Sequence, residues 1–322
     1  MPEPTFDRNR FEDARARIAG FVHRTPLLHS RTLSERVGAP LYLKCENLQR
    51  TGASKVRGAL HRLLRLTDDE RARGVVTISA GNHAQAVAWA ARTARVRAVV
   101  VMPEHASRAK VDASRGYGAE VVLHGDARAA FARAFELAEE RGLRFVHPFD
   151  DEEVVAGHGS CALEILEDLP DVEAIVVPVG GGGLISGIAA ATAAVRPGVA
   201  VWGVEPEGAD AMARSLAAGH AVHLERVSTV ADGLAAPMAG TLNHALVAAH
   251  GRGVVTVGDA RIVEAMGLLL ERTKLLTEPA GAAGLAGLLD GGIPVPEGPV
   301  AVILSGGNVD MTTLARLLLE GA

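Results

Sequence analysis

The sequence is poor in cysteine and in long apolar stretches. Cys45 and Cys161 are the only cysteines, too few and too far apart for a disulfide framework or a Cys-X-X-Cys metal site, and they suit a reducing compartment. Glycine or a charged residue interrupts each apolar run before it reaches membrane-spanning length, and the N-terminal segment lacks the apolar core of a secretion signal. We therefore expect a cytoplasmic protein that does not span a membrane.

Positive charge is also limited. The formal net charge is −5 and no long basic run occurs, so the chain lacks the broad positive surface that a nucleic acid requires. We expect no nucleic-acid partner. Arginine carries almost all of the positive charge, so chemistry that needs a titratable amine has only four lysines to choose from: Lys44, Lys55, Lys110 and Lys274.

What the sequence does have is enough apolar material for a large core, in a regular alternation of patterns. The chain has 322 residues, and 48% of them are hydrophobic. Short β-branched runs alternate with helical patterns, which predicts an α/β fold of parallel sheets joined by crossover helices. The predicted strands are 75–79, 98–102, 120–124, 145–147, 174–179, 201–204, 254–257 and 300–304, and the predicted helices include 83–93, 106–114, 127–140 and 260–274.

The same alternation predicts two domains. His147 and Pro148 close a run of short strand-helix units, so we expect residues 71–148 to form a smaller, mobile α/β domain. Residues 1–70 and 149–322 would combine into a larger one. No linker or repeat marks the boundary, and one continuous sheet is the alternative.

One of the four lysines stands at the predicted start of a helix. The positive end of the helix dipole and partial burial both favour the neutral amine of Lys55, which is a nucleophile suited to Schiff-base formation. A solvated surface lysine is the alternative for this residue considered alone. The apolar face that places Lys55 in the first turn consists of Val56, Ala59, Leu60, Leu63 and Leu64.

Four consecutive glycines follow a predicted apolar strand. Gly180 to Gly183 allow close approach of the backbone, and the helix that continues from Leu184 aims its N-terminus at the same point. A dinucleotide-binding loop is excluded because neither Gly180 nor Gly181 has a glycine five positions later, and a Walker loop because no Gly-Lys-Ser/Thr follows. A single phosphate is the natural ligand, and a merely flexible turn is the alternative.

Two further polar segments lie at strand ends. Residues 79–83, Ser-Ala-Gly-Asn-His, end one predicted strand and begin a helix, so their backbone N–H groups face an anion. The last predicted strand leads into residues 305–310, Ser-Gly-Gly-Asn-Val-Asp. Taken alone, Ser79, Asn82 and Ser305 could equally be helix caps or turn residues, and His83 a polar residue of a first turn.

Together these segments resemble the threonine dehydratase and serine racemase group of fold-type II pyridoxal-phosphate enzymes, within the tryptophan synthase β-like superfamily. The runs that begin at Ser79 and Ser305 match the SxGNHxQ and SGGN[VI]D motifs of that group. Ala53 and Ser54 replace a usual Ser-Phe pair, which changes one wall near the cofactor. The resemblance implies two parallel-sheet αβα domains with pyridoxal 5′-phosphate between them. Matches to the TGSFK[IV]RGA motif are Thr51, Gly52, Lys55, Arg57, Gly58 and Ala59.

The resemblance also implies roles for individual residues. Lys55 would be the catalytic residue that binds the cofactor covalently, and Ser305 would hydrogen-bond the pyridine nitrogen. Asp232-Gly233 matches a further step of the family pattern, to which we assign no chemical role. The other implied cofactor-binding residues are Asn82, Gly180, Gly181, Gly182, Gly183, Leu184 and Glu278, and the implied substrate-binding residues are Ser79, Ala80, Gly81, Asn82 and His83.

The reaction that the resemblance implies is β-elimination of water from threonine or serine, giving a 2-oxo acid and ammonia. The alternatives are a racemase of the serine racemase kind, a lyase for another hydroxy amino acid such as 3-hydroxyaspartate, and a non-catalytic protein that binds a phosphate ligand. Racemases of the group place a serine where this chain has Ala80, and alanine has no transferable proton, which favours elimination. We expect a small amino acid as substrate and a homodimer or larger homo-oligomer.

No metal site is predicted. The run from Val204 to Ala211 resembles a segment that binds a divalent cation in some racemase-like members, but Ala211 stands where those members supply a carboxylate. His220 and His223 lack further ligand-like partners. Because the chain ends 12 residues after Asp310, we also expect no appended regulatory domain and no feedback control through one.

Overall fold

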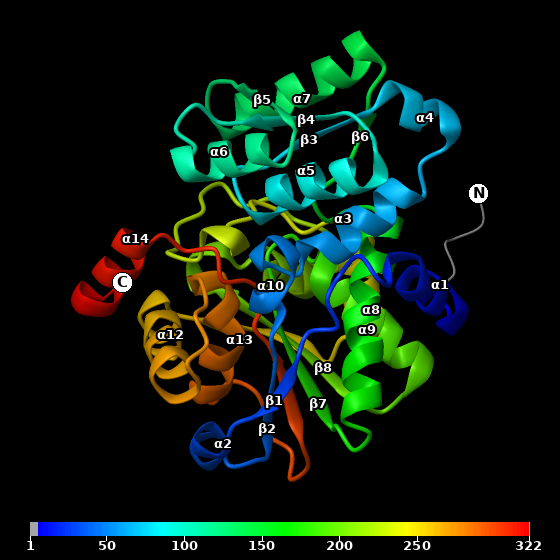
Figure 1. The fold of residues 1–322 in the computed structure, drawn as a ribbon. Helices are drawn as coiled ribbons and strands as arrows, with labels where there is room; N and C mark the ends of the chain where they lie inside the picture. The colour runs from blue at the N-terminus through cyan, green and yellow to red at the C-terminus, as the bar shows by residue number, and fades with distance from the viewer. Residues whose placement is uncertain (1–5, 322) are drawn as a thin grey trace.

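The computed structural model describes residues 6–321 as an α/β protein with two separate sheets (Figure 1). Every pair in the four-stranded sheet is parallel, as is every pair in the six-stranded sheet except β1 with β2. The predicted α/β fold with parallel sheets in two domains is confirmed, and the alternative of one continuous sheet is wrong. In sheet order, the strands are β5 (Glu120–Leu123), β4 (Ala98–Met102), β3 (Val75–Ile78) and β6 (Arg144–Phe145), then β1 (Leu27–His29), β2 (Leu41–Lys44), β10 (Val300–Ile303), β7 (Ala174–Pro178), β8 (Ala200–Pro206) and β9 (Gly253–Val257).

Helices cover both faces of each sheet. Around the four-stranded sheet these are α3 (Lys55–Leu64), α4 (Asp68–Arg73), α5 (Asn82–Ala94), α6 (Arg108–Gly116) and α7 (Ala127–Arg141). Around the six-stranded sheet they are α1 (Arg8–Ile18), α2 (Arg31–Val37), α8 (Glu152–Asp168), α9 (Gly183–Val195), α10 (Ala211–Ala218), α11 (Thr241–His250), α12 (Asp259–Thr273), α13 (Pro279–Leu289) and α14 (Met311–Glu320). Short 3-10 turns occur at η1 (Glu46–Leu48), η2 (Arg50–Gly52), η3 (Glu207–Ala209) and η4 (Asp232–Leu234).

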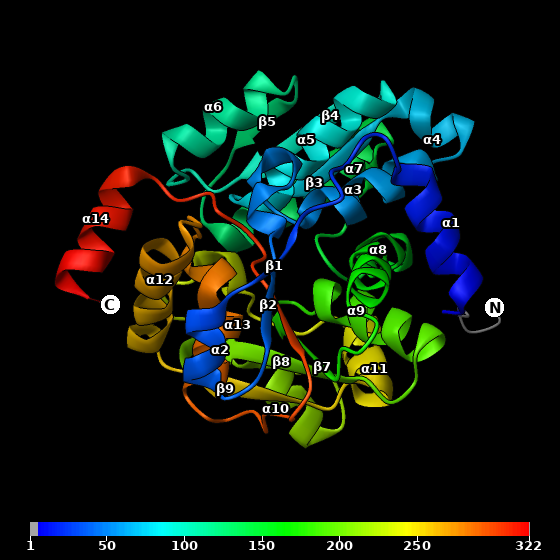
Figure 2. The same cartoon turned by 60° about the horizontal axis from the view of Figure 1, so that its bottom comes forward.

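The two faces of the six-stranded sheet bury alternate residues of its strands. Ile175 and Val177 of β7 pack with α1, α8, α9 and α11, whereas Val176 between them packs with α2, α12 and α13. Figure 2 shows these two groups of helices on opposite sides of the sheet. The same alternation separates α3 and α5 from α7 across the four-stranded sheet, because successive side chains of a strand point to opposite faces. Each sheet is therefore the middle layer of an αβα sandwich. Among residues 6–321, no helix is both long and apolar enough to cross a membrane.

The predicted strands and helices are all present, with ends that differ by at most two residues. The strands β1 and β2 were not predicted. β1 has only three residues and is largely exposed, and the buried β2 ends in Lys44, so neither shows the apolar pattern of a core strand.

The parallel arrangement brings three loops together at the carboxyl ends of the strands. β3 leads into residues 79–81 and α5, β7 into the four glycines and α9, and β10 into Ser305 and the loop after it. An isolated bridge between Ala53 and Gly306 ties the start of α3 to the β10 loop, and Ser54 N donates to Ser305 O at 2.9 Å. Ligands of open α/β sheets bind at such strand ends, so the fold itself points to this region.

Candidate active site

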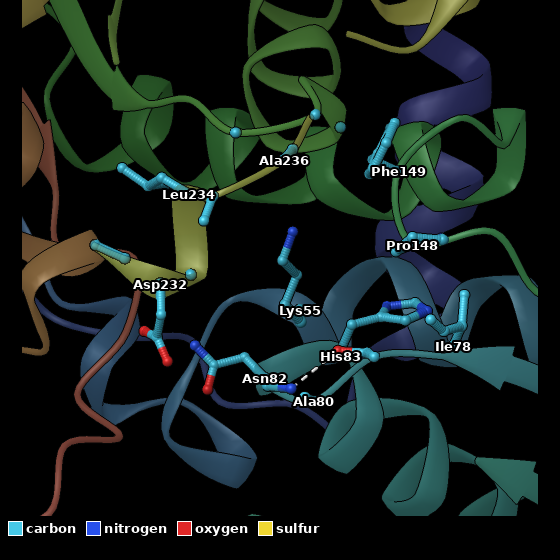
Figure 3. A pocket seen from close by; sticks show the side chains of 18 of the residues that line it. Lys55, Ile78, Ala80, Asn82, His83, Pro148, Phe149, Asp232, Leu234 and Ala236 are labelled. Atoms are coloured by element: carbon cyan, nitrogen blue, oxygen red, sulfur yellow. Dashed lines mark hydrogen bonds between the residues drawn. The ribbon is translucent and has the colours of Figure 1, made fainter. Parts of the chain in front are cut away.

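A cavity of about 650 Å³ lies where these loops meet (Figure 3). It is lined by every residue that the sequence analysis proposed for cofactor or substrate, although these come from five separate parts of the chain. The proposed residues that line it are Lys55, Ser79, Ala80, Gly81, Asn82, His83, Gly180, Gly181, Gly182, Gly183, Leu184, Glu278 and Ser305.

Lys55 is the first residue of α3, as predicted, and its side chain extends into the cavity (Figure 3). Burial lowers the pKa of the Lys55 amine, and the nearby Glu278 carboxyl opposes that shift only in part. Among the residues that the structure describes, none forms a hydrogen bond or ion pair with Lys55 Nζ. The site therefore contains a partly buried amine that is shifted toward its neutral, nucleophilic form.

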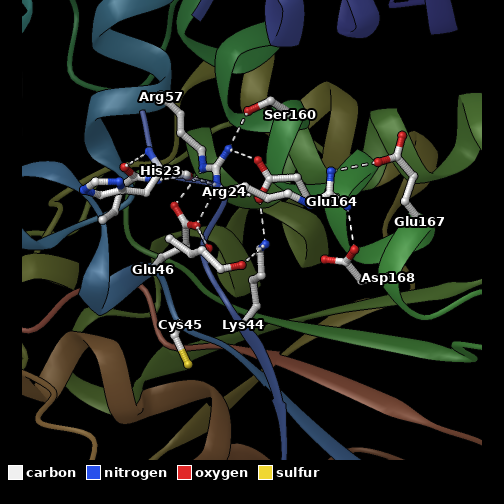
Figure 4. A network of polar contacts seen from close by, with 12 residues as sticks. His23, Arg24, Lys44, Cys45, Glu46, Arg57, Ser160, Glu164, Glu167 and Asp168 are labelled. Carbon is white, nitrogen blue, oxygen red and sulfur yellow. Dashed lines mark hydrogen bonds and ion pairs between the residues drawn. The ribbon is translucent and has the colours of Figure 1, made fainter. Parts of the chain in front are cut away.

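Arg57, which lies two residues after Lys55 on the same helix, points away from the cavity. It belongs to a buried ion network that consists of Lys44, Glu46, Arg57 and Glu164 (Figure 4). Arg57 donates to both oxygens of Glu46 at 2.8 Å and to the oxygens of Glu164 at 2.7 and 2.8 Å. Lys44 Nζ donates to Glu164 at 2.6 Å and to Thr25 O at 2.7 Å. Two cations thus neutralise two carboxylates, and the network fixes the back of α3 against α8.

The glycine loop forms a cradle at the start of α9. Gly182 has φ +102, a left-handed conformation that favours glycine. A Cβ atom on Gly181 would lie 2.4 Å from the Phe149 ring, and one on Gly182 would lie 2.5 Å from the Met212 side chain. Larger residues therefore do not fit here, and the backbone N–H groups at the helix N-terminus stay open to the cavity. This arrangement suits one phosphate group.

Asn82 and Glu278 connect the loops on the opposite side of the cavity. Asn82 Nδ2 donates to Glu278 Oε1 at 2.5 Å, and Asn308 Nδ2 donates to Asn82 Oδ1 at 2.8 Å. Burial, together with the negative charge of Asp232, raises the pKa of Glu278 to about 7. Glu278 is thus a carboxyl that changes protonation near neutral pH, in contrast to an ordinary loop acid.

The segment after β3 presents a turn to the cavity. Gly81 N donates to Ser79 Oγ at 3.0 Å, and Ala80 between them has no group that can donate or accept a proton through its side chain. His83 is buried and its Nε2 lies 3.1 Å from Thr77 Oγ1. Burial and the nearby Lys55 lower the pKa of His83 to about 3, so its imidazole is neutral. Any anion in this turn must rely on backbone and hydroxyl donors.

Ser305 ends the set of predicted residues. Among the residues that the structure describes, its Oγ donates only to Ala280 O, at the long distance of 3.4 Å, and it lines the cavity. A hydroxyl with so weak a partner can turn toward a ring nitrogen in the cavity. The neighbouring Gly306 could not carry a side chain, because a Cβ there would lie 2.2 Å from Glu278 Oε1.

The structure adds residues that the sequence analysis missed. Lys110 of α6 forms an ion pair with Asp232 of η4 at the cavity, joining the two halves of the molecule. Phe131, His147 and Phe149 line the cavity as well. Lysine and phenylalanine are scarce in this chain, with four and seven residues, and that scarcity was the available signal.

The segment around Glu205, which resembles a cation-binding segment, instead forms hydrogen bonds within the protein. Glu205 accepts hydrogen bonds from Met212 N and Ala213 N, both at 2.8 Å, so its carboxyl caps α10, and burial raises its pKa to about 8. His220 and His223 are exposed. Residues 6–321 contain no group of three or more His, Cys, Asp or Glu side chains placed to hold a metal ion.

Comparison with known proteins gives consistent matches. A family model described as pyridoxal-phosphate dependent enzyme matches residues 18–306. An L-threonine ammonia-lyase from Thermotoga maritima is 44% identical over 311 residues, 96% of this chain and 77% of that protein. An L-threo-3-hydroxyaspartate ammonia-lyase from Saccharomyces cerevisiae is 41% identical over 309 residues, 95% of this chain and 94% of that protein. The solved structure of maize serine racemase superposes with a TM-score of 0.92 at 38% identity and covers 98% of this chain and 97% of that chain.

Proposed function

Because the chain belongs to the family of pyridoxal-phosphate dependent enzymes, we propose that it is a threonine or serine ammonia-lyase. It eliminates water from a β-hydroxy amino acid and yields a 2-oxo acid and ammonia. The observation that carries the proposal is Lys55, an amine with a lowered pKa and no described partner, in the same cavity as a glycine cradle for phosphate.

The residues present fit pyridoxal phosphate. The cradle of Gly180 to Gly183, continued by Leu184, suits the phosphate group because these glycines carry no side chains of their own and line the cavity at the N-terminus of α9. Asn82, Glu278 and the weakly bonded hydroxyl of Ser305 surround the position left for the ring, within reach of Lys55. The cofactor, when bound, supplies an electron-withdrawing ring that stabilises negative charge at the substrate's α-carbon.

Binding of the substrate carboxylate and proton transfer then depend on the protein's own groups. The turn at residues 79–83 supplies backbone N–H groups and the Ser79 hydroxyl for the substrate carboxylate. Lys55 Nζ, favoured in its neutral form, accepts the α-proton. The resulting ammonium group then returns a proton to the β-hydroxyl as its C–O bond breaks, so that the hydroxyl departs as water. Elimination needs one acid–base group beside a departing hydroxyl, whereas racemisation needs a second on the opposite face. Ala80 supplies none there, which favours the lyase over a racemase.

Three further parts of the proposal concern the protein as a whole. We assign residues 71–148 to a smaller domain that moves relative to residues 1–70 and 149–322, which the separate four-stranded sheet supports. A homodimer or larger homo-oligomer and a cytoplasmic location complete the proposal. The scarcity of cysteine supports a reducing compartment.

A substrate panel tests the function. Purified holoenzyme is incubated with L-threonine, L-serine, D-serine and L-threo-3-hydroxyaspartate, and 2-oxo acid, ammonia and the chirality of residual serine are measured. We expect equimolar 2-oxo acid and ammonia from L-threonine or L-serine, with little D-serine. Faster racemisation than ammonia release from L-serine, or no 2-oxo acid from any of the four, would contradict the proposal.

A further inference from the structure

Most of the phenylalanine in this chain gathers in one place. Four of its seven phenylalanines and one histidine form what we call the aromatic wall: Phe131, Phe135, Phe145, His147 and Phe149. Ring centroids are 5.0 Å apart for Phe131 and Phe135, 4.4 Å for Phe135 and Phe145, 6.0 Å for Phe145 and His147, and 4.6 Å for His147 and Phe149. These are contact distances for aromatic pairs, so the wall is a continuous surface.

The wall begins outside the cavity and ends at the glycine cradle. Phe131, His147 and Phe149 line the cavity, and Phe149 contacts Gly181. Phe131 lies on α7 one turn after Ala127, which also lines the cavity, and 40% of its surface is exposed. An aromatic ring left open beside a cavity is available to an apolar group of a ligand.

Other walls of the cavity are also apolar. Residues 234–238, Leu-Ala-Ala-Pro-Met, all line it, and Leu234 and Ala236 are visible above Lys55 in Figure 3. Ile78, at the end of β3, adds another aliphatic side chain. None of these side chains can donate a hydrogen bond to an anionic or strongly polar substituent.

The charges that face the cavity do not favour a second carboxylate on the substrate. The titratable groups that line it are Lys55, His83, His105, Lys110, His147, Asp232 and Glu278. Lys110 is paired with Asp232, and burial lowers the pKa values of His83 and His147, which favours their neutral forms. A carboxylate on the β-carbon would lose its hydration beside the acids Asp232 and Glu278, a placement that is unfavourable without a partner.

We propose that the site prefers a β-hydroxy amino acid whose β-carbon carries an uncharged apolar group larger than methyl, up to an aromatic ring, and that Phe131 is a residue that determines this specificity. The inference rests on the proposed ammonia-lyase function. It selects among the substrates of that reaction: aryl-substituted serine first, threonine next, serine below both, and 3-hydroxyaspartate last. One methylene group in an apolar pocket is worth about 10- to 200-fold in kcat/KM.

The test has a kinetic and a binding arm. In the kinetic arm, kcat/KM is measured for L-threo-3-phenylserine, L-threonine, L-serine and L-threo-3-hydroxyaspartate, and we expect phenylserine to exceed serine by about tenfold or more. Turnover of serine and threonine without turnover of phenylserine would overturn the inference and leave the lyase function intact. Absence of 2-oxo acid from all four would instead overturn the lyase function.

The binding arm needs no turnover. L-Phenylalanine and L-aspartate carry no β-hydroxyl group and cannot lose water, so their dissociation constants with the holoenzyme are measured by calorimetry. We expect phenylalanine to bind about tenfold or more tightly than aspartate. Equal or tighter binding of aspartate would overturn the inference whatever reaction the enzyme catalyses.

Substitutions of Phe131 test whether this residue determines the preference for phenylserine. Phe131→Ala should reduce the preference for phenylserine over serine by about tenfold, and Phe131→Leu should retain part of it. The matched control is Phe21→Ala, which removes a similarly exposed ring that belongs neither to the cavity lining nor to the aromatic wall. The control should keep the wild-type preference. An equal change in Phe131→Ala and Phe21→Ala would overturn the role of Phe131.

Discussion

Lys55 and Arg57 lie two residues apart on α3, and their surroundings differ in every respect that matters to a buried cation. Arg57 is fully buried and donates to two carboxylates, and these partners hold its pKa raised although burial opposes the charged form. Lys55 faces the cavity without a described partner, and burial lowers its pKa. A buried charge whose partners are present is thus part of the fold, whereas a buried amine without a described partner is available for chemistry.

Two carboxyl groups that influence these cations, Glu46 beside Arg57 and Glu278 near Lys55, differ in the same way. Arg57 lowers the pKa of Glu46 against the effect of burial, whereas burial and Asp232 raise that of Glu278 to about 7. One acid belongs to a neutralised network, and the other can gain or lose a proton in the working range of pH. Substitution of Arg57 should therefore mainly lower stability, whereas substitution of Lys55 should mainly lower activity.

The largest effect is expected for Lys55→Ala. Loss of the amine should reduce kcat by about 10³-fold or more and abolish covalent retention of the cofactor, because base catalysis alone contributes about 10²- to 10⁴-fold. The free energy of unfolding of the apoprotein should stay the same or rise, since an unpaired buried amine is removed. Kinetics, cofactor absorbance and urea denaturation measure the three quantities. The exposed Lys274, changed to Asn to suit its left-handed backbone, is the control and should keep activity.

Arg57→Met should have the opposite profile. It leaves Glu46 and Glu164 buried without their main partner, which destabilises a protein by about 3–5 kcal/mol. Urea denaturation of the apoprotein measures the loss. Arg17→Met, which breaks the surface pair with Asp13, is the control and should change stability by about 1 kcal/mol or less. Equal stability of the two variants would contradict the role of Arg57 in holding the buried carboxylates.

Features that depend on local sequence patterns could be predicted from the sequence alone, whereas contacts between distant residues could not. The predicted strands and the helix start at Lys55 depend on local periodicity, and the glycine loop on composition, so a single sequence contains them. The buried ion network depends on Lys44 and Glu164 meeting across 120 positions of chain, and no local pattern encodes that meeting. For the same reason, the sequence matched Arg57 to a motif but indicated no role for its side chain. The sequence also did not indicate that Lys110 forms an ion pair with Asp232.

The smallest effect concerns pH. A carboxyl whose folded pKa lies above its unfolded value retains a proton that the unfolded chain releases, so stability falls as pH rises between the two values. For Glu278 this window runs from about 4.5 to about 7. Glu278→Gln keeps an acceptor for Asn82 and should lessen the loss of apoprotein stability across the window by about 3 kcal/mol at most. Denaturation at pH 5 and pH 8 measures it, and identical pH dependence in wild type and variant would contradict the raised pKa.

We propose that Lys55, alone among the four lysines, holds the cofactor. Reduction of the holoenzyme with borohydride, followed by proteolysis and mass spectrometry, locates the lysine that carries it. We expect a single modified peptide containing Lys55, and no peptide with bound cofactor from Lys55→Ala. Modification of Lys44, Lys110 or Lys274 in the wild-type protein, or no covalent cofactor on any lysine, would contradict it.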